Sequence, residues 1–273
     1  MNRHVLYILC LMNCWVPMLP AAEPLVPHQA EWQLITKAIS EGKPKTGSEL
    51  LAGIERSAIE DKQWDEVASA IATRVLLENS DRPGDDPQRL IDLDAAIQGV
   101  PIHTRGALQA IQANWTWTFF QMNRWRFAQR TTQAQSDANR DLSEINSWDL
   151  RRIVLEIHNQ FEKALSDDGG LKGLPVEDWA MLIEAGTMGK AYRPTLWDVV
   201  VRDAIAFHQT GERGLVEPED AFELEASSPA LQAVNIFRKW RPAQAEAGND
   251  LVTDKDSPIL LVISLYQQIL NFH

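Results

Sequence analysis

Residues 46–78 read TGSELLAGIERSAIEDKQWDEVASAIATRVLLE, and this stretch decides the fold. Its apolar residues recur at the three- and four-residue spacing of an amphipathic helix, whereas strand-like alternation is nearly absent. The pattern breaks around Lys62–Gln63. The stretch therefore predicts two helices, and with the segment before it forms antiparallel-hairpin material at roughly tetratricopeptide length.

The same helical period continues on both sides of this hairpin. Segments rich in proline, glycine and aspartate, such as DRPGDDP at 81–87, predict the turns between helices. Helices are expected at 28–41, at 87–99 and from Pro101 to about Arg130. The next helix is capped by Asn146 or Ser147 and ended by glycines in 166–173, and a shorter helix follows from Pro175. Further helices are expected from Pro194 or Thr195, at 228–240 and at 257–272. The polar QSDANRDLSEIN before Ser147 is expected to be a loop. The predicted fold class is all-α, an array of antiparallel helical hairpins that is tetratricopeptide-like or α-solenoid-like, although the full tetratricopeptide signature is missing.

Two of these segments show their apolar face clearly. The stripe of the helix after Ser147 is Leu150, Ile153, Val154, Ile157, Phe161 and Leu165. In the last segment the residues that share a face are Ile259, Val262, Ile263, Tyr266 and Leu270.

The first 22 residues have the layout of a secretory signal peptide. Arg3 precedes an apolar run, and the small residues Ala21 and Ala22 follow it. The run is too short and interrupted for a membrane span, and a lipoprotein acylated at Cys10 or Cys14 is the less favoured alternative. We therefore expect a periplasmic or secreted protein with a domain at 23–273, divisible at 28–80 and 87–273, and no cysteine in the mature chain.

The formal net charge of −12 bears on the partners of the chain. A strongly acidic protein repels phosphate backbones and anionic lipid surfaces, so we expect no nucleic-acid partner. A basic or neutral protein is the expected kind of partner.

Motifs that would carry chemistry fail on spacing. GTMGKA at 186–191 lacks the first glycine and the final Ser or Thr of a phosphate loop. The histidines lack metal-site spacing, and the pairs His158–Glu162 and His28–Glu31 are expected to be surface pairs. We therefore assign no catalytic, cofactor-binding or metal-binding residue, expect no cofactor, and can name no binding residue.

The aromatic stretch ANWTWTFFQMNRWRFAQRT at 113–131 could stack sugars or bases. Its apolar residues form two stripes, however, and a helix that is apolar on two sides is expected to lie buried between neighbours. The first stripe is Ile111, Trp115, Phe119 and Met122, and the second is Trp117, Phe120 and Phe127. Trp125 belongs to the same aromatic set, and Arg124, Arg126 and Arg130 are expected to reach over the core. The sequon at Asn114 lies inside this helix and is discounted.

The segment YRPTLWDVVVRDAIAFH at 192–208 has a structural reading for each of its residues. Thr195 followed by Asp198 is a capping-box pattern with Asp in place of Glu. Asp198 and Arg202 are four residues apart and are expected to form an ion pair.

This segment, extended to AYRPTLWDVVVRDAIAFHQTGE, resembles a motif in the N-terminal helical region of bacterial alpha-2-macroglobulin-like proteins. The stretches at 114–131, 147–167 and 256–273 are similar to blocks of the same region in the same order. The resemblance implies a tetratricopeptide-like module of a cell-envelope protease trap, present alone as a split or truncated form. It carries over no thioester or catalytic residue, because no position here matches one.

The expected function is therefore non-enzymatic: an exported helical module for protein–protein docking linked to protease inhibition. Its partner would be macroglobulin-like domains encoded separately, or a protease. The alternative is a secreted all-α hydrolase or lyase acting on polysaccharides, for which Glu177, Asp178 and Asp198 are the candidate carboxylates.

Overall fold

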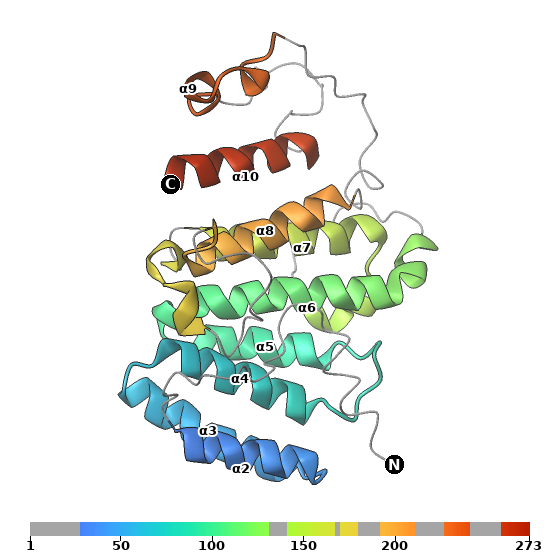
Figure 1. The fold of residues 1–273 in the computed structure, drawn as a ribbon. Coiled ribbons are helices and arrows are strands. Elements are labelled where there is room, and N and C mark those ends of the chain that lie inside the picture. The colour runs from blue at the N-terminus through green and yellow to red at the C-terminus, as the bar shows by residue number, and fades with distance from the viewer. Residues whose placement is uncertain (1–27, 131–140, 167–169, 180–191, 211–226, 241–257) are drawn as a thin grey trace.

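The computed structural model describes residues 28–130, 141–166, 170–179, 192–210, 227–240 and 258–273. Each element within these ranges is helical, apart from one isolated bridge between Pro175 and Thr195. The predicted all-α class is confirmed. The proposed signal peptide at 1–22 and the GTMGKA segment lie outside the described residues. Figure 1 shows the helices stacked in layers, with α2 and α3 at one end and α10 and α9 at the other.

The two helices predicted from residues 46–78 are present. Helix α3 spans Pro44–Glu60 and α4 spans Trp64–Glu78, and α2 at Gln29–Ser40 lies beside α3 (Figure 1). The chain reverses at Lys62, whose φ of 58° is left-handed and ends the helical path at the predicted break. Gly42, with φ of 71°, makes the corresponding turn between α2 and α3.

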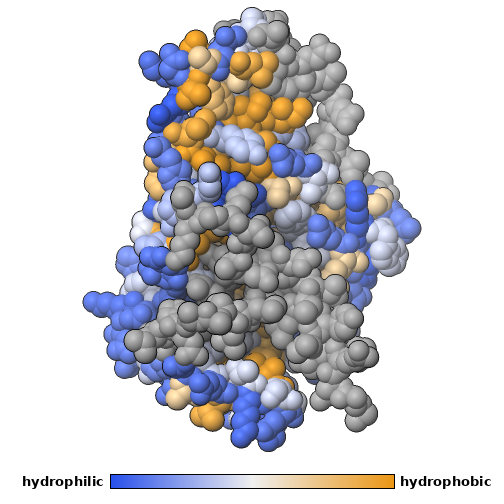
Figure 2. All heavy atoms as spheres, viewed as in Figure 1, coloured by the Kyte–Doolittle hydropathy of each residue, from blue (hydrophilic) through white to orange (hydrophobic). Residues whose placement is uncertain are grey.

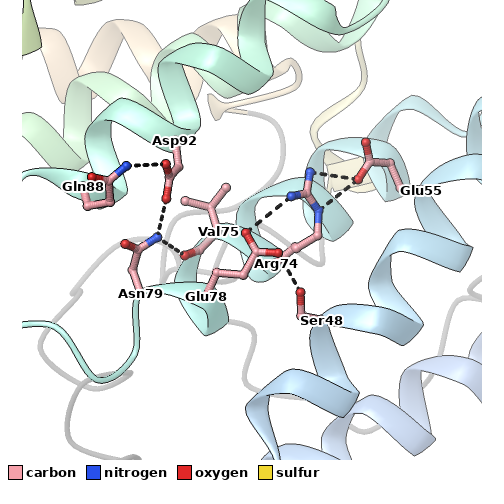
Figure 3. Close-up of polar contacts among 8 residues, drawn as sticks. All are labelled: Ser48, Glu55, Arg74, Val75, Glu78, Asn79, Gln88 and Asp92. Carbon is pink, nitrogen blue, oxygen red and sulfur yellow. Dashed lines mark hydrogen bonds and ion pairs between the residues drawn. The ribbon is translucent and has the colours of Figure 1, made fainter.

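Polar side chains join the layers at the edges of this region (Figure 3). The Arg74 guanidinium on α4 lies 3.1 Å from the Glu55 carboxylate on α3 and 3.5 Å from that of Glu78. Asn79 donates to Asp92 on the next helix at 2.9 Å. These contacts connect α4 to α3 on one side and to the helix after the predicted turn at 81–87 on the other.

The central helices are α5 at Gln88–Gly99 and the 27-residue α6 at Ile102–Ala128. As expected for a helix between neighbours, α6 buries most of its aromatic set: Trp115, Phe119, Phe120 and Phe127. The prediction is wrong for Met122 and Trp125, which are 57% and 63% exposed. Residues 104–120 of α6 are all buried or half-buried, whereas beyond Phe120 only Asn123 and Phe127 of this helix are buried.

The predicted loop before Ser147 is partly a 3-10 helix, η1 at Leu142–Ser147, and η1 buries Leu142 and Ile145. Helix α7 begins at Leu150 and ends at Leu165. Its N-cap is Asp149, whose Oδ1 accepts the Arg152 backbone N–H at 2.8 Å. The predicted cap at Asn146 or Ser147 is wrong, because those residues belong to η1.

The C-terminal part begins with two short 3-10 turns, η3 at Leu171–Gly173 and η4 at Val176–Trp179. Helix α8 spans Leu196–Gln209 and has the predicted capping box, with Thr195 as N-cap and Asp198 at the third helical position. The apolar side chains of α8 are buried along most of its length, among them Leu196, Val200 and Phe207.

The chain ends in a layer formed by α10 at Pro258–Phe272 and by residues 227–240. The single helix predicted over 228–240 is wrong. Residues 227–240 instead hold η7 at Pro229–Leu231 and α9 at Val234–Phe237. The break lies at Gln232, whose extended backbone interrupts the helical path. We call α10 together with residues 227–240 the C-terminal layer.

Buried apolar side chains form two clusters in the described residues. The larger extends from Ala58 on α3 to Leu265 on α10 and includes the tryptophans Trp115, Trp148, Trp179 and Trp197. The smaller, at the α2 end, consists of Ile35, Leu51, Ile54 and Ala70. The larger cluster thus connects the C-terminal layer to the body of the stack.

Candidate functional site

The three candidate carboxylates do not share one environment. Asp198 is only 1% exposed, and both of its carboxylate oxygens are engaged. Its Oδ2 accepts from the backbone N–H and the hydroxyl of Thr195, at 3.0 and 2.8 Å, and its Oδ1 lies 2.9 Å from Nε2 of His273. Glu177 and Asp178 are exposed on η4. The structure thus separates one internal carboxylate from two surface ones.

The expected ion pair between Asp198 and Arg202 is not formed. The capping box turns the Asp198 carboxylate back toward Thr195, away from the following turn of α8. Arg202 instead donates to the backbone carbonyl of Tyr192 at 3.2 Å. Both carboxylate oxygens of Asp198 already have partners, in Thr195 and His273.

Thr195, Asp198 and His273 bring a hydroxyl, a carboxylate and an imidazole together. Nucleophilic catalysis requires the imidazole to take the proton of the hydroxyl. Here the Thr195 hydroxyl donates to the carboxylate, and the imidazole contacts the other carboxylate oxygen. The arrangement instead joins the first turn of α8 to the end of α10.

The histidine pairs expected at the surface are placed differently. His28 Nδ1 lies 2.8 Å from Glu66 on α4, and not against Glu31, and the Trp32 indole donates to the other Glu66 oxygen at 2.9 Å. Glu66 is fully buried, so these contacts anchor α2 to α4. His158 does approach Glu162 at 3.4 Å, but its side chain is buried beside His208, with ring centroids 5.3 Å apart.

In the part of the chain that the structure describes, no group of three or more His, Cys, Asp or Glu residues is placed to hold a metal ion. Within the same residues, no helix is both long and apolar enough to cross a membrane.

Two of the three arginines expected to reach over the core form structural contacts instead. Arg126 pairs with Asp85 at 2.9 Å, and Arg130 donates to the Trp148 carbonyl at 2.9 Å. Asn114 of the discounted sequon is 8% exposed and donates to Asp203 on α8 at 3.3 Å. These contacts hold α6 against its neighbours.

Burial raises the pKa of Asp203 from 3.8 to about 6, against the opposing effects of the Asn114 hydrogen bond and the Arg193 charge. The folded chain therefore holds this proton more tightly than the unfolded chain, and this group's contribution to stability falls as the pH rises from about 4 to about 6.

The side chain of Asp203→Asn stays neutral and can still accept from Asn114. We therefore expect the free energy of unfolding of the variant, relative to that of the wild type, to rise by about 2–3 kcal/mol as the pH increases from about 4 to about 7.5. Urea unfolding at the two pH values measures the gain. Gln209→Asn, an exposed change on the same helix that alters no titratable group, is the control. A difference between variant and wild type that is constant over pH would contradict the prediction.

Among the residues that the structure describes, the largest concentration of exposed apolar side chains lies on the C-terminal layer. Helix α10 contains no Asp, Glu, Lys or Arg. Its residues Ile259, Tyr266 and Leu270 are 52%, 44% and 40% exposed. The half-buried Ile263 shares their face, and we call these four residues the α10 seam. In the adjoining segment Leu231, Val234 and Ile236 are also exposed. Figure 2 shows hydrophobic residues gathered over this layer.

The shared face predicted for the last helix is therefore mostly its exposed face. The side of α10 that packs on the body carries Leu265, together with Val262, Ile269 and Phe272. Gln267 is buried on a third side and donates to the backbone carbonyls of Phe237 and Trp240, at 2.6 Å each. Periodicity found the face, but the lack of any charged residue all around the helix was the signal that more than one side is apolar.

Comparison of the chain with protein-family models, with curated proteins and with solved structures gives no match.

Proposed function

We propose that this protein is a non-enzymatic, exported helical module that docks a protein partner through its C-terminal layer. The observation that carries the proposal is the exposed, uncharged α10 seam together with Leu231, Val234 and Ile236. Isolated exposed apolar residues are normal on a folded protein, whereas several of them gathered in one patch mark an interaction site.

The free energy that burial of the exposed apolar side chains would contribute supports docking. Complete burial of one large aliphatic or aromatic side chain stabilises by about 1.5–3 kcal/mol. The exposed fractions of the seam residues leave roughly half of that unrealised in the free chain. A partner that covered the whole layer would gain from several such residues at once, and burying α10 would bring no charged side chain out of water.

The resemblance to alpha-2-macroglobulin-like proteins suggests the biological setting. In that setting the partner would be separately encoded macroglobulin-like domains or a protease, and docking would serve protease inhibition in the cell envelope. The acidic balance of the whole chain favours a partner that is basic or neutral overall.

The alternative, a polysaccharide-active hydrolase or lyase, draws less support from the candidate carboxylates. Its chemistry needs two carboxyl groups facing one sugar bond. Asp198 is enclosed by Thr195 and His273, whereas Glu177 and Asp178 are exposed. No specific observation favours this function over docking.

The test is cross-linking of the chain in the envelope of its own cell, followed by mass spectrometry. We compare Ile259→Gln/Leu270→Gln with the matched pair Leu34→Gln/Ile59→Gln, whose exposed fractions at the far end of the stack are 52% and 37%. We expect a macroglobulin-like protein or a protease to cross-link to the wild type and to the far-end pair, and to be lost from the seam pair. Equal cross-linking of both variants would overturn the proposal.

A further inference from the structure

The spacing of the α10 seam is the first clue to what covers it. Ile259, Ile263, Tyr266 and Leu270 follow one another at four, three and four residues. This spacing produces a narrow apolar stripe along one side of a helix, and it is the spacing by which one α-helix packs along another. The seam is therefore shaped for a helix.

The position of the seam gives the second clue. At 100° per residue the seam lies between the side of α10 that packs on the body, through Leu265, and the side that Gln267 bonds to residues 227–240. The seam is thus continuous with an existing helix–helix interface, that of α10 with α8. A further helix laid along it would extend the packing already present in the layer.

Charge gives the third clue. Within its described residues, the C-terminal layer carries Arg238 and Lys239 and no Asp or Glu, although the whole chain has a net charge of −12. The Arg238 guanidinium donates to Asn271 on α10 at 3.1 Å, and Asn271 directly follows the seam residue Leu270. The charged side chains in the described part of this layer are therefore both positive, and acidic side chains on an incoming helix complement them.

We propose that the α10 seam binds one amphipathic α-helix of a partner protein, with an apolar stripe at the same spacing and acidic residues along its flanks. This inference rests on the proposed docking function and names the element of the partner that docks. A partner that is basic or neutral overall can carry such an acidic helix, because the helix responds to the local positive charge of the layer. A second copy of the chain is a poorer occupant, since the described residues of its layer offer no carboxylate to complement Arg238 and Lys239.

The test uses the full chain and two synthetic amphipathic helices. The peptides share a leucine stripe at four-, three- and four-residue spacing and differ only in carrying glutamate or lysine on the flanks. Fluorescence anisotropy at about 0.15 M salt, where the distant charges of the body are screened, measures binding. We expect the glutamate peptide to bind the wild type about three- to tenfold more tightly than the lysine peptide, because two rim cations each contribute weakly.

Two variants locate the binding. Ile259→Gln/Leu270→Gln is expected to weaken the glutamate peptide by about tenfold or more, and Leu34→Gln/Ile59→Gln is expected to leave it unchanged. Lys239→Glu should reduce the preference for glutamate without abolishing binding. Because the substituted positions are exposed, each variant is expected to fold, and circular dichroism checks this.

Three results would overturn the inference. The first is a lysine peptide that binds as tightly as the glutamate peptide, and the second is a glutamate peptide that does not bind or that binds the seam variant normally. The third is a wild-type dimer, seen by light scattering, that Ile259→Gln/Leu270→Gln dissociates, because the seam would then be occupied by a second copy. If the peptides fail while the seam variant still loses its cross-linked envelope partner, the docking function stands and only the acidic helix is wrong.

Discussion

Trp197→Ala is expected to lower the free energy of unfolding by about 3–5 kcal/mol. Trp197 on α8 is 1% exposed and joins two elements that are distant in sequence. Its ring meets Phe272 of α10 edge-on, with centroids 5.3 Å apart, and the Lys172 ammonium lies 5.1 Å from its centroid. Alanine would leave a cavity between α8 and α10 and remove the aromatic contact. Chemical denaturation followed by circular dichroism measures the loss.

Trp125→Ala is the matched control for this prediction. Trp125 lies on α6 and is 63% exposed, so the same truncation should change the free energy of unfolding by no more than about 0.5 kcal/mol. If both variants lost the same stability, the cause would be tryptophan content, and the packing argument for Trp197 would fail.

Asp198→Ala is expected to lower the free energy of unfolding by about 2–4 kcal/mol. The substitution removes one half of the capping box and leaves the Thr195 backbone N–H, its hydroxyl and the His273 imidazole without their acceptor. The same carboxylate also holds the end of α10. We therefore expect the substitution to accelerate hydrogen exchange more in residues 258–273 than in α7, relative to the wild type. Denaturation gives the overall cost, and exchange followed by mass spectrometry locates it.

Two comparisons make this second prediction specific. Asp178→Ala, at an exposed carboxylate on η4, should change stability by no more than about 0.5 kcal/mol. His273→Ala removes the imidazole that contacts Asp198 and keeps both halves of the capping box, so it should accelerate exchange in α10 while leaving the cap of α8 intact. Uniform exchange along the chain in Asp198→Ala would show that Asp198 does not anchor α10.

Local features were predictable because neighbours in sequence decide them. The break at Lys62, the turn at 81–87 and the capping box of Thr195 with Asp198 depend on backbone geometry within a few residues. The burial of Phe120 also followed from the helix itself, since apolar residues on both sides of a helix require neighbours on both sides.

Pairings were predicted less well, because a side chain chooses among all the groups that the fold brings near it. His28 was expected beside Glu31 and instead contacts Glu66, 38 residues away. Asp198 was expected beside Arg202 and instead contacts His273, 75 residues away. In both cases the observed partner lies on another helix or directly after one, and it could not be found from spacing along one helix.

The docking site shows the same division. The four-, three- and four-residue spacing of the α10 seam is a property of the sequence, and so are the all-α class, the helix breaks and the helix cap, because each arises from periodicity or from local backbone chemistry. Only the tertiary structure decided that this stripe faces outward while Leu265 faces the core. A helix that is apolar on several sides can pack by any of them, and the neighbours that cover one side leave another open.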